Sequence, residues 1–315
     1  MKKRVVVTGG AGFIGSNLVA ELAKDNEVTV IDDLSTGDLK NIKDLVDTKK
    51  IDFIKGSITD LALLQKTCKN VDYVFHEAAI ASVTRSIKEP LAINNVNING
   101  TLNVLVAARD NHVKKVVFAS SCAIYGNPLK RPIKESTIPD PLTPYALSKL
   151  VGEYYCQVFN KIYNLSTVSL RYFNVYGPHQ DPAGDYAAVI PKFINQILDG
   201  RPPPIYGDGK QTRDFIFVAD VVRANILAVE RDVTGVFNIA SGRQTSIDDL
   251  ANGIMEIAEK NIKPVYHALR PGDIKYSLAD ISKIKSQGYS PKITLEEGLR
   301  TTFEWFSKIN WTFWK

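Results

Sequence analysis

The chain has 315 residues, of which 44% are hydrophobic, and its net charge is +5. This length allows one large α/β domain, or such a domain with a smaller lobe. The modest positive charge is spread out, which disfavours nucleic-acid binding but suits an anionic substrate. Three cysteines without a C-x-x-C pair disfavour a disulfide framework, and four scattered histidines predict no metal site. With no signal peptide and no membrane-length apolar run, we expect a cytoplasmic protein without a membrane partner.

The first half of the sequence alternates strand patterns with helix patterns. Strand-like apolar runs are expected at residues 4–7, 27–31, 51–54, 71–75, 113–119 and 165–170. Helices are expected between them, at residues 13–24, 60–68, 90–112 (as one long helix) and 145–163. Such alternation predicts an α/β fold with a doubly wound parallel sheet and helices on both faces. Ligands bind such sheets at the carboxyl ends of the strands.

The sequence pattern changes from residue 174 onward. Glycine and proline turns separate short elements there, which predicts a smaller C-terminal substrate-binding lobe formed mainly by residues 174–315. Residues 1–173 would then form the nucleotide-binding domain. Apolar runs at 215–217 and 236–239 are expected to return strands to the main sheet, within a segment of about 213–240.

A glycine-rich turn directly follows the first strand. Gly9, Gly12 and Gly15 form a G-x-x-G-x-x-G spacing that opens into a helix, and backbone N–H groups at such a turn bind a pyrophosphate. The second strand ends at Asp32, where an acid accepts hydrogen bonds from ribose hydroxyls and repels a 2′-phosphate. Strand, turn and acid together predict a Rossmann-type site that prefers NAD to NADP.

Two further patterns carry candidate chemistry. Tyr145 and Lys149 lie four residues apart on one helix face, and a nearby ammonium stabilises a phenolate that can act as a base. Ser120 and Ser121 end the fifth strand, where a hydroxyl can relay a substrate proton. Each pattern alone also fits a solvated helix face or a turn serine. Their order after the glycine turn and Asp32 favours a catalytic set.

The order of these motifs resembles the extended short-chain dehydrogenases/reductases along nearly the whole chain. The glycine turn is similar to that family's TGxxGxxG loop. Three later motifs are similar to those of nucleotide-sugar enzymes, above all the UDP-hexose 4-epimerases; they occupy residues 170–178, 213–220 and 270–273. The resemblance implies NAD as cofactor and a homodimer formed through the two long helices expected at 90–112 and 145–163.

Site residues follow from the resemblance and the motifs together. The implied catalytic residues are Ser121, Tyr145 and Lys149. The implied cofactor contacts, besides Tyr145 and Lys149, are Gly9, Gly12, Phe13, Ile14, Gly15, Asp32, Asp33, Ser35, Thr36, Gly37, Ser57, Ile58, Ala78, Ala79, Asn97, Ser120 and Tyr172. The implied substrate contacts are Ser82, Ser121, Asn174, Ala188, Val189, Tyr206, Arg213, Arg270, Asp273 and Ser277. Ser57 departs from the family, which usually has an aspartate there, and this weakens one adenine contact.

The residues after Ser121 bear on the reaction. Related dehydratases and decarboxylases carry acidic residues there, whereas this chain has Cys122 and Ala123, which cannot serve as acid–base groups for elimination. This favours reversible oxidation at C4 of a UDP-hexose. Ser277 and Ser82 match positions that leave room for an N-acetyl group, so we expect interconversion of UDP-GlcNAc and UDP-GalNAc, together with UDP-Glc and UDP-Gal. The alternatives are a UDP-glucuronate 4-epimerase or decarboxylase, a nucleotide-sugar dehydratase, and a non-catalytic nucleotide-binding module.

Overall fold

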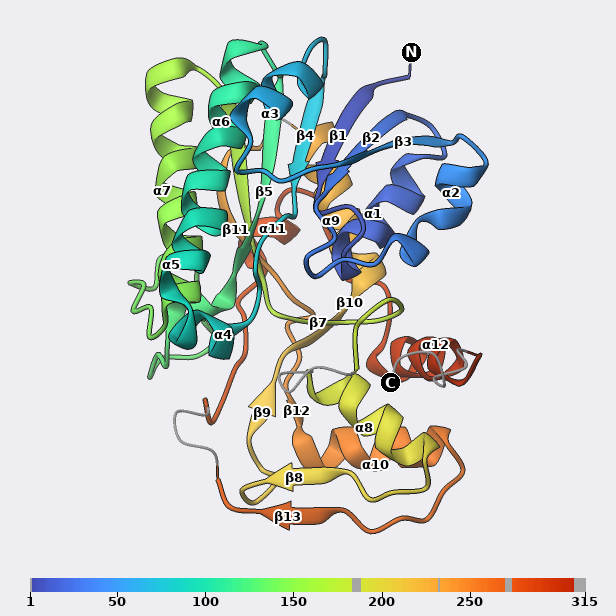
Figure 1. Ribbon diagram of the computed structural model, residues 1–315. Coiled ribbons are helices and arrows are strands. Elements are labelled where there is room, and N and C mark those ends of the chain that lie inside the picture. The colour runs from blue at the N-terminus through green and yellow to red at the C-terminus, as the bar shows by residue number, and fades with distance from the viewer. Residues whose placement is uncertain (1, 183–187, 232, 270–273, 309–315) are drawn as a thin grey trace.

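A computed structural model describes residues 2–182, 188–231, 233–269 and 274–308, and shows a sheet-containing part with a lobe below it (Figure 1). The central sheet has seven strands in the order β11-β6-β5-β4-β1-β2-β3, and every pairing in it is parallel. Its strands are β1 (Arg4–Thr8), β2 (Glu27–Asp32), β3 (Ile51–Lys55), β4 (Tyr73–His76), β5 (Lys115–Ser121), β6 (Ser166–Tyr172) and β11 (Gly235–Ile239). The predicted doubly wound parallel sheet is confirmed.

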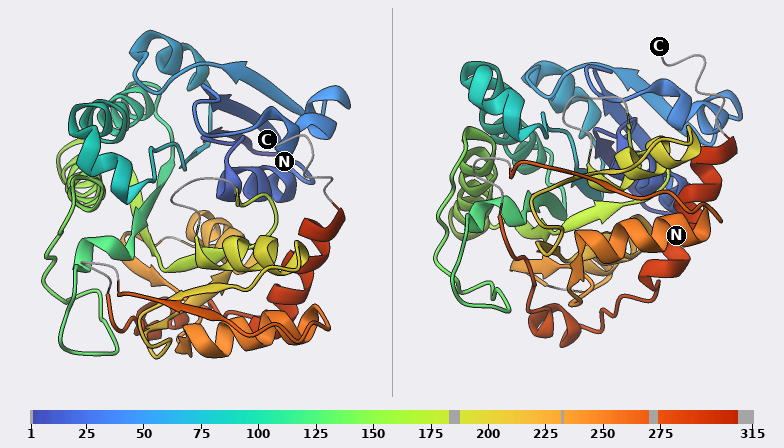
Figure 2. Two further views of the ribbon diagram at one scale, coloured as in Figure 1. Left: turned by 60° about the horizontal axis from the view of Figure 1, so that its bottom comes forward. Right: turned by 90° about the horizontal axis from the view of Figure 1, so that it is seen from below.

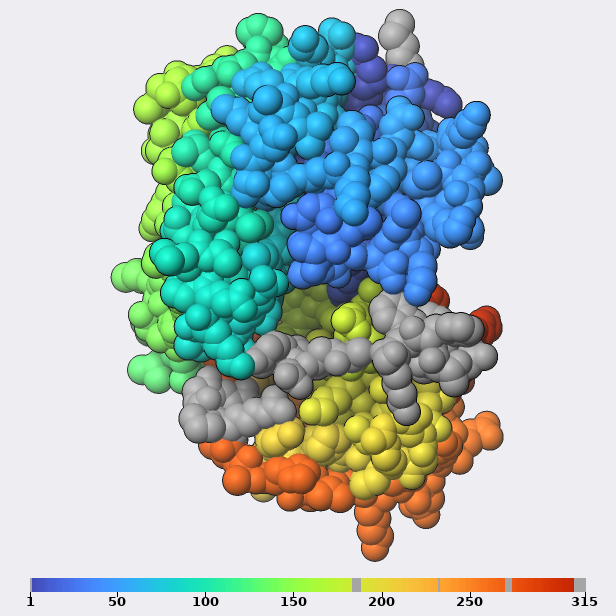
Figure 3. Space-filling view, viewed as in Figure 1, coloured from blue at the N-terminus to red at the C-terminus, as the bar shows by residue number. Residues whose placement is uncertain are grey.

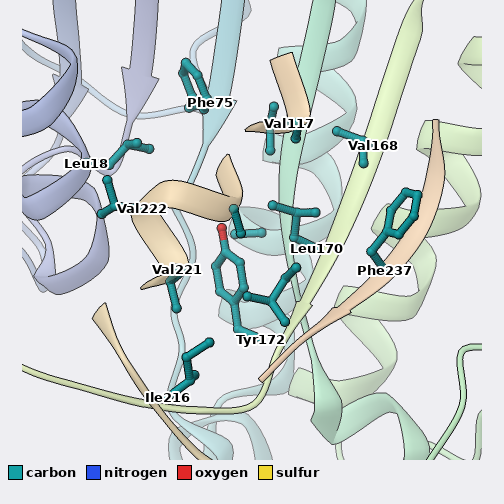
Figure 4. Close-up of a cluster of buried hydrophobic side chains, with 14 of the residues drawn as sticks. Leu18, Phe75, Val117, Val168, Leu170, Tyr172, Ile216, Val221, Val222 and Phe237 are labelled. Carbon is teal, nitrogen blue, oxygen red and sulfur yellow. The ribbon is translucent and has the colours of Figure 1, made fainter. Parts of the chain in front are cut away.

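Helices cover both faces of the sheet because its strands carry buried side chains on both sides. One hydrophobic cluster joins the strands to Leu18 of α1 and Val221 of α9, as Figure 4 shows. A second cluster joins them to Leu64 of α3, Val104 of α6 and Phe159 of α7. The helices around the sheet are α1 (Phe13–Leu22), α2 (Lys43–Asp47), α3 (Leu61–Thr67), α4 (Val83–Lys88), α5 (Pro90–Ile93), α6 (Thr101–Asp110), α7 (Pro144–Tyr163), α9 (Val218–Glu230) and α11 (Ser282–Lys285). Short 3₁₀ turns are η1 (Leu39–Asn41) and η3 (Cys122–Tyr125).

The long helix expected at residues 90–112 is interrupted. A π-helical segment, η2 (Asn94–Gly100), separates α5 from α6. The wider turn lets Asn97 point inward, where its side chain bonds both backbone groups of Ile80. The hydrophobic period of a helix does not reveal such a bulge, which typically occurs at functional sites. The prediction of one regular helix was therefore wrong in its middle.

The lobe contains short strands and three helices. Its strands are β7 (Asn174–Tyr176) with β10 (Phe215–Phe217), β8 (Pro204–Tyr206) with β13 (Val265–His267), and β9 (Thr212–Arg213) with β12 (Thr245–Ser246). The helices α8 (Val189–Leu198), α10 (Ile247–Ile257) and α12 (Leu295–Lys308) pack together around a third hydrophobic cluster (Figures 1 and 2).

Only one of the two segments expected to return to the main sheet does so. Residues 235–239 join it as β11 beside β6, whereas residues 215–217 pair with β7 in a separate two-stranded sheet. The strand prediction for 215–217 was right but its partner was wrong, because three apolar residues carry no information on pairing. In the part of the chain that the structure describes, no helix has the length and apolar character needed to cross a membrane.

Candidate active site

The glycine turn forms a cradle between β1 and α1. Gly9 has a φ of +72°, and a Cβ there would lie 2.6 Å from the backbone nitrogen of Ala78. A Cβ on Gly15 would lie 2.1 Å from the carbonyl oxygen of Gly9. Gly12 is the N-cap of α1, so the positive end of the helix opens onto the cradle. Only glycine fits at Gly9 and Gly15, and an anionic ligand can therefore approach the backbone closely.

A cavity of about 280 Å³ runs along this edge of the sheet. Predicted residues that line it are Gly9, Gly12, Phe13, Ile14, Gly15, Asp32, Asp33, Ser35, Thr36, Ser57, Ile58, Ala78 and Ala79. Asp32 also organises the turn, because its Oδ2 accepts a hydrogen bond of 2.9 Å from Ala11 N and its Oδ1 accepts one of 2.8 Å from Leu34 N. Burial raises the pKa of Asp32, and these two backbone donors oppose that rise. The cavity has the shape and the polar groups that an adenine dinucleotide requires.

The three predicted catalytic side chains lie together where β5 meets α7. Thr143 caps α7 and Pro144 begins it, so Tyr145 falls in the first turn and Lys149 one turn later. The hydroxyl of Tyr145 hydrogen-bonds the side chain of Ser121, which follows the buried part of β5. Lys149 is buried, and its Nζ donates a hydrogen bond of 2.7 Å to Ala119 O.

Burial shifts the pKa of both titratable residues in this group, Tyr145 and Lys149. It raises the pKa of Tyr145 to about 12, while the hydrogen bond from Ser121 lowers it. Burial lowers the pKa of Lys149 to about 8, and the nearby Glu77 carboxylate opposes this. A phenol with so high a pKa needs positive charge close by to act as a base at neutral pH.

Several predicted cofactor residues lie behind the cavity wall. Asn97 is buried, and besides Ile80 it donates a hydrogen bond of 3.1 Å to Ser148 Oγ on α7. It thereby ties the loop after β4 to the helix that carries the catalytic pair. The hydroxyl of Ser120 donates at 2.5 Å to Glu153, which forms a buried ion pair of 2.7 Å with Arg171. The side chain of Ser120 is therefore engaged by the buried Glu153, and Ser120 is not among the residues that line the cavity.

The remaining predicted cofactor residues, Gly37 and Tyr172, contact residues that line the cavity. A Cβ on Gly37 would lie 3.1 Å from the Asp32 carboxylate, so this glycine packs directly against the acid at the end of β2. Tyr172 ends β6, and its hydroxyl donates a hydrogen bond of 2.8 Å to Glu77 Oε1.

A second cavity of about 240 Å³ lies in the lobe. Predicted substrate residues that line it are Asn174, Ala188, Val189, Tyr206 and Arg213. Arg213 is close enough to Cys122, the residue after Ser121, to lower its thiol pKa, although burial raises that pKa to about 12 overall. Arg213 therefore links the lining of the lobe cavity to the residue after Ser121. A space-filling view shows a hollow between the first half of the chain and the lobe (Figure 3).

Two other predicted substrate residues, Ser277 and Ser82, lie apart from this lining. Ser277 is buried on the segment beside β9, where its backbone N–H donates to Thr212 O at 3.1 Å. Ser82 caps α4, its Oγ accepting a hydrogen bond of 3.1 Å from Arg85 N. Arg270 and Asp273 lie outside the described residues.

Two residues in these cavities were missed by the sequence reasoning. Glu77 follows β4 and lines the dinucleotide cavity next to Ala78. Gln211 lines the lobe cavity, and among the described residues its buried Oε1 has no hydrogen-bond partner. The sequence around Gln211, just after a predicted loop, did not indicate a binding residue. Glu77 could have been predicted from its position at the end of a strand.

Comparison with known proteins agrees with this geometry. A model of the NAD dependent epimerase/dehydratase family matches residues 5–240. The chain belongs to this family. The glycine cradle and Asp32 fit its cofactor, since a side chain at Gly9 or Gly15 would fill the space that the pyrophosphate needs.

Individual relatives cover almost the full chain. The chain is similar to the solved UDP-N-acetylglucosamine 4-epimerase from Methanobrevibacter ruminantium M1 in complex with UDP-N-acetylmuramic acid, with a TM-score of 0.95 and 48% identity over 98% of this chain and 100% of that one. A putative UDP-glucose 4-epimerase from Methanocaldococcus jannaschii is 39% identical, over 98% of this chain and all of that protein. A UDP-N-acetyl-alpha-D-glucosaminuronate decarboxylase from Bacillus cytotoxicus is 36% identical, over 98% of this chain and 99% of that protein. A human dTDP-D-glucose 4,6-dehydratase is 35% identical, over 99% of this chain and 92% of that protein.

Proposed function

We propose that this chain is an NAD-dependent UDP-hexose 4-epimerase that interconverts UDP-GlcNAc with UDP-GalNAc, and UDP-Glc with UDP-Gal. The observation that carries the proposal is the group of Ser121, Tyr145 and Lys149 where β5 meets α7, in a chain that also has a dinucleotide cavity at the sheet edge and a second cavity lined by Arg213. Cys122 and Ala123 follow this set in place of acids. The arrangement supports oxidation and reduction of a sugar carbon without elimination.

Bound NAD would accept the C4 hydride of the sugar and return it to the opposite face. Tyr145 takes the proton of the C4 hydroxyl, and Ser121 keeps that hydroxyl in line through its hydrogen bond to the phenol. Lys149, fixed by Ala119 O, contributes a positive charge that favours the phenolate. Arg213 holds the diphosphate by charge-assisted hydrogen bonds while the 4-keto sugar turns over between the two hydride transfers.

The nucleotide part of the substrate would occupy the lobe cavity. Tyr206 offers an aromatic face for uracil, and its ring already stacks on His267 with centroids 5.3 Å apart. The free Oε1 of Gln211 supplies an acceptor that a base N–H would satisfy, and a buried acceptor of this kind is costly when left unpaired. Arg270 and Asp273 complete the proposed contacts on grounds of resemblance.

The choice of sugar rests on Ser277. Its side chain is buried beside the strand that carries Arg213. On grounds of resemblance, a serine at this position would leave room for an N-acetyl group that a tyrosine would exclude. The similar protein from Methanobrevibacter ruminantium, described as a UDP-N-acetylglucosamine 4-epimerase, supports this choice at 48% identity. Decarboxylase and dehydratase relatives make elimination the competing reaction, and the Cys122-Ala123 pair argues against it.

We further propose a cytoplasmic homodimer. Leu147, Tyr154, Val158 and Ile162 are exposed along α7 at helical spacing. An apolar stripe with this spacing lies on one face of the helix and suits packing against the same helix of a second copy. Ile87 and Leu91, also exposed on the neighbouring α4 and α5, extend the surface.

The proposal is tested by incubating the purified protein with UDP-GlcNAc or UDP-Glc, without added NAD, and separating the products. The expected products are UDP-GalNAc and UDP-Gal. Release of CO₂ from UDP-glucuronate, or formation of a 4-keto-6-deoxy sugar, would assign the chain to the decarboxylases or dehydratases instead. Absence of turnover on every sugar nucleotide would support a non-catalytic module.

A further inference from the structure

Glu77 is a half-buried acid that the cycle above does not use. It lines the dinucleotide cavity immediately after β4, on the same edge as the glycine cradle. One of its carboxyl oxygens, Oε1, accepts a hydrogen bond of 2.8 Å from the hydroxyl of Tyr172. The Tyr172 oxygen in turn accepts a hydrogen bond of 2.8 Å from Asn225 Nδ2 on α9.

The donors around the acid bear on its charge. The phenolic hydrogen of Tyr172 has two acceptors in reach, Glu77 Oε1 at 2.8 Å and Asn225 Oδ1 at 3.1 Å, and the shorter contact favours Glu77. A chain of donors that ends on a carboxylate favours its ionised form. Asn225 is fixed by a further bond of 3.0 Å to Val221 O, so the donor chain is anchored in a helix.

Glu77 also lies within electrostatic reach of the catalytic pair. It affects the pKa of both Lys149 and Tyr145, which must meet the reacting end of the cofactor. Asp32 and Ser57 line the same cavity at the ends of β2 and β3, beyond the glycine cradle, where the adenosine half belongs. Glu77 therefore stands at the nicotinamide end.

We propose that the Glu77 carboxylate is the counter-charge of the nicotinamide end of the cavity and keeps the bound cofactor oxidised between turnovers. The inference rests on the proposed function, because an epimerase must start each cycle with NAD⁺. A fixed negative charge stabilises the positive nicotinamide ring of NAD⁺ and gives no such benefit to the neutral ring of NADH. The same charge favours return of the hydride from the reduced cofactor to the 4-keto sugar, which is the acceptor that the cycle itself supplies.

The groups that face Glu77 determine its pH response. They are Lys149 and Tyr145 from α7 and Tyr172 from β6. Burial raises the pKa of Glu77 to about 7, against the lowering effects of Tyr172 and Lys149. The positive ring of NAD⁺ lowers this pKa further, so the carboxylate is charged in the resting enzyme near neutral pH.

The test is a redox titration of the holoenzyme with a soluble mediator of known potential, following the near-ultraviolet absorbance of the reduced cofactor. Glu77→Gln keeps the size and the acceptor but removes the charge. We expect its bound cofactor to be reduced at least tenfold more readily than that of wild type at alkaline pH, because one charge within about 10 Å changes an equilibrium by that factor or more at an effective dielectric constant of about 20. The difference should vanish at acidic pH, where Glu77 is protonated. Glu77→Asp retains the charge, so the potential of its bound cofactor should lie close to that of wild type.

A second variant separates charge from packing. Tyr172→Phe removes the donor that lowers the Glu77 pKa, so the pH at which the potential changes should move upward while the charge is retained. Equal potentials for wild type and Glu77→Gln at all pH values would overturn the inference, as would an offset that does not change with pH. Because no sugar is present, a positive result with an enzyme that fails to epimerise would reject the proposed function and leave the role of Glu77 standing.

Discussion

Replacement of the Tyr145 hydroxyl is the perturbation whose effect the geometry defines best. Tyr145→Phe keeps the ring in the first turn of α7 but removes the group that hydrogen-bonds Ser121. Burial raises the Tyr145 pKa to about 12, so forming the phenolate at pH 7 requires roughly 7 kcal/mol of compensating interaction. The enzyme would supply this interaction energy through Lys149 and the positive charge of its cofactor. Such stabilisation of the phenolate contributes to catalysis only if the phenolate is the base.

A positioned general base contributes about 10²- to 10⁴-fold to a rate. We therefore expect Tyr145→Phe to lower kcat for UDP-GlcNAc epimerisation by about 10³-fold, or roughly 4 kcal/mol in the barrier. KM should change little, because Tyr145 is not among the residues that line the lobe cavity. The assay measures initial rates of UDP-GalNAc formation at several substrate concentrations.

The matched control is Tyr163→Phe, at the far end of the same helix and 46% exposed. It removes a phenolic hydroxyl without touching the site, and its kcat should equal that of wild type. A Tyr145→Phe enzyme that retains more than about a tenth of wild-type kcat would refute the assignment, since so small a loss falls below the range for general-base catalysis.

Three further variants probe the cofactor cradle, the sugar and the scaffold. Gly15→Ala places a Cβ 2.1 Å from a backbone oxygen of its own loop and should abolish NAD retention by the purified protein, whereas Gly253→Ala, with its nearest neighbour at 3.9 Å, should retain it. Ser277→Tyr should abolish activity on UDP-GlcNAc and spare activity on UDP-Glc. Equal loss of activity on both substrates would reject the proposed role of Ser277 in the choice of sugar. Arg171→Met leaves Glu153 buried and unpaired, so it should lower the free energy of unfolding by about 3–5 kcal/mol in urea titrations; a change below about 1 kcal/mol would contradict this.

Local sequence patterns predicted the parallel sheet because they report on short-range physics. Alternating apolar runs and helical periods are set by burial on each element. The glycine turn is also local, since Gly9 and Gly15 are required by contacts within one loop and its neighbouring strand end. The 213–240 segment shows the limit, because pairing of residues 215–217 with β7 depends on where the chain returns in space.

Long-range hydrogen bonds are what the sequence did not reveal. The π-helical segment at Asn94–Gly100 is maintained by Asn97, whose partners Ile80 and Ser148 are distant in the chain. Glu77 likewise acquires its environment from Tyr172 and from Lys149, on different elements. The roles of the predicted site residues remain predictions, although the cavities bring many of them together.

Transfer of a label at C4 tests the central claim most directly. The protein, without added NAD, is given UDP-GlcNAc that carries deuterium at C4, and the UDP-GalNAc formed is examined by mass spectrometry and NMR. If the C4 hydride is taken up and returned within one active site, the deuterium should remain at C4 of the product. Loss of the deuterium to solvent, or formation of a product that has lost water, would contradict the account.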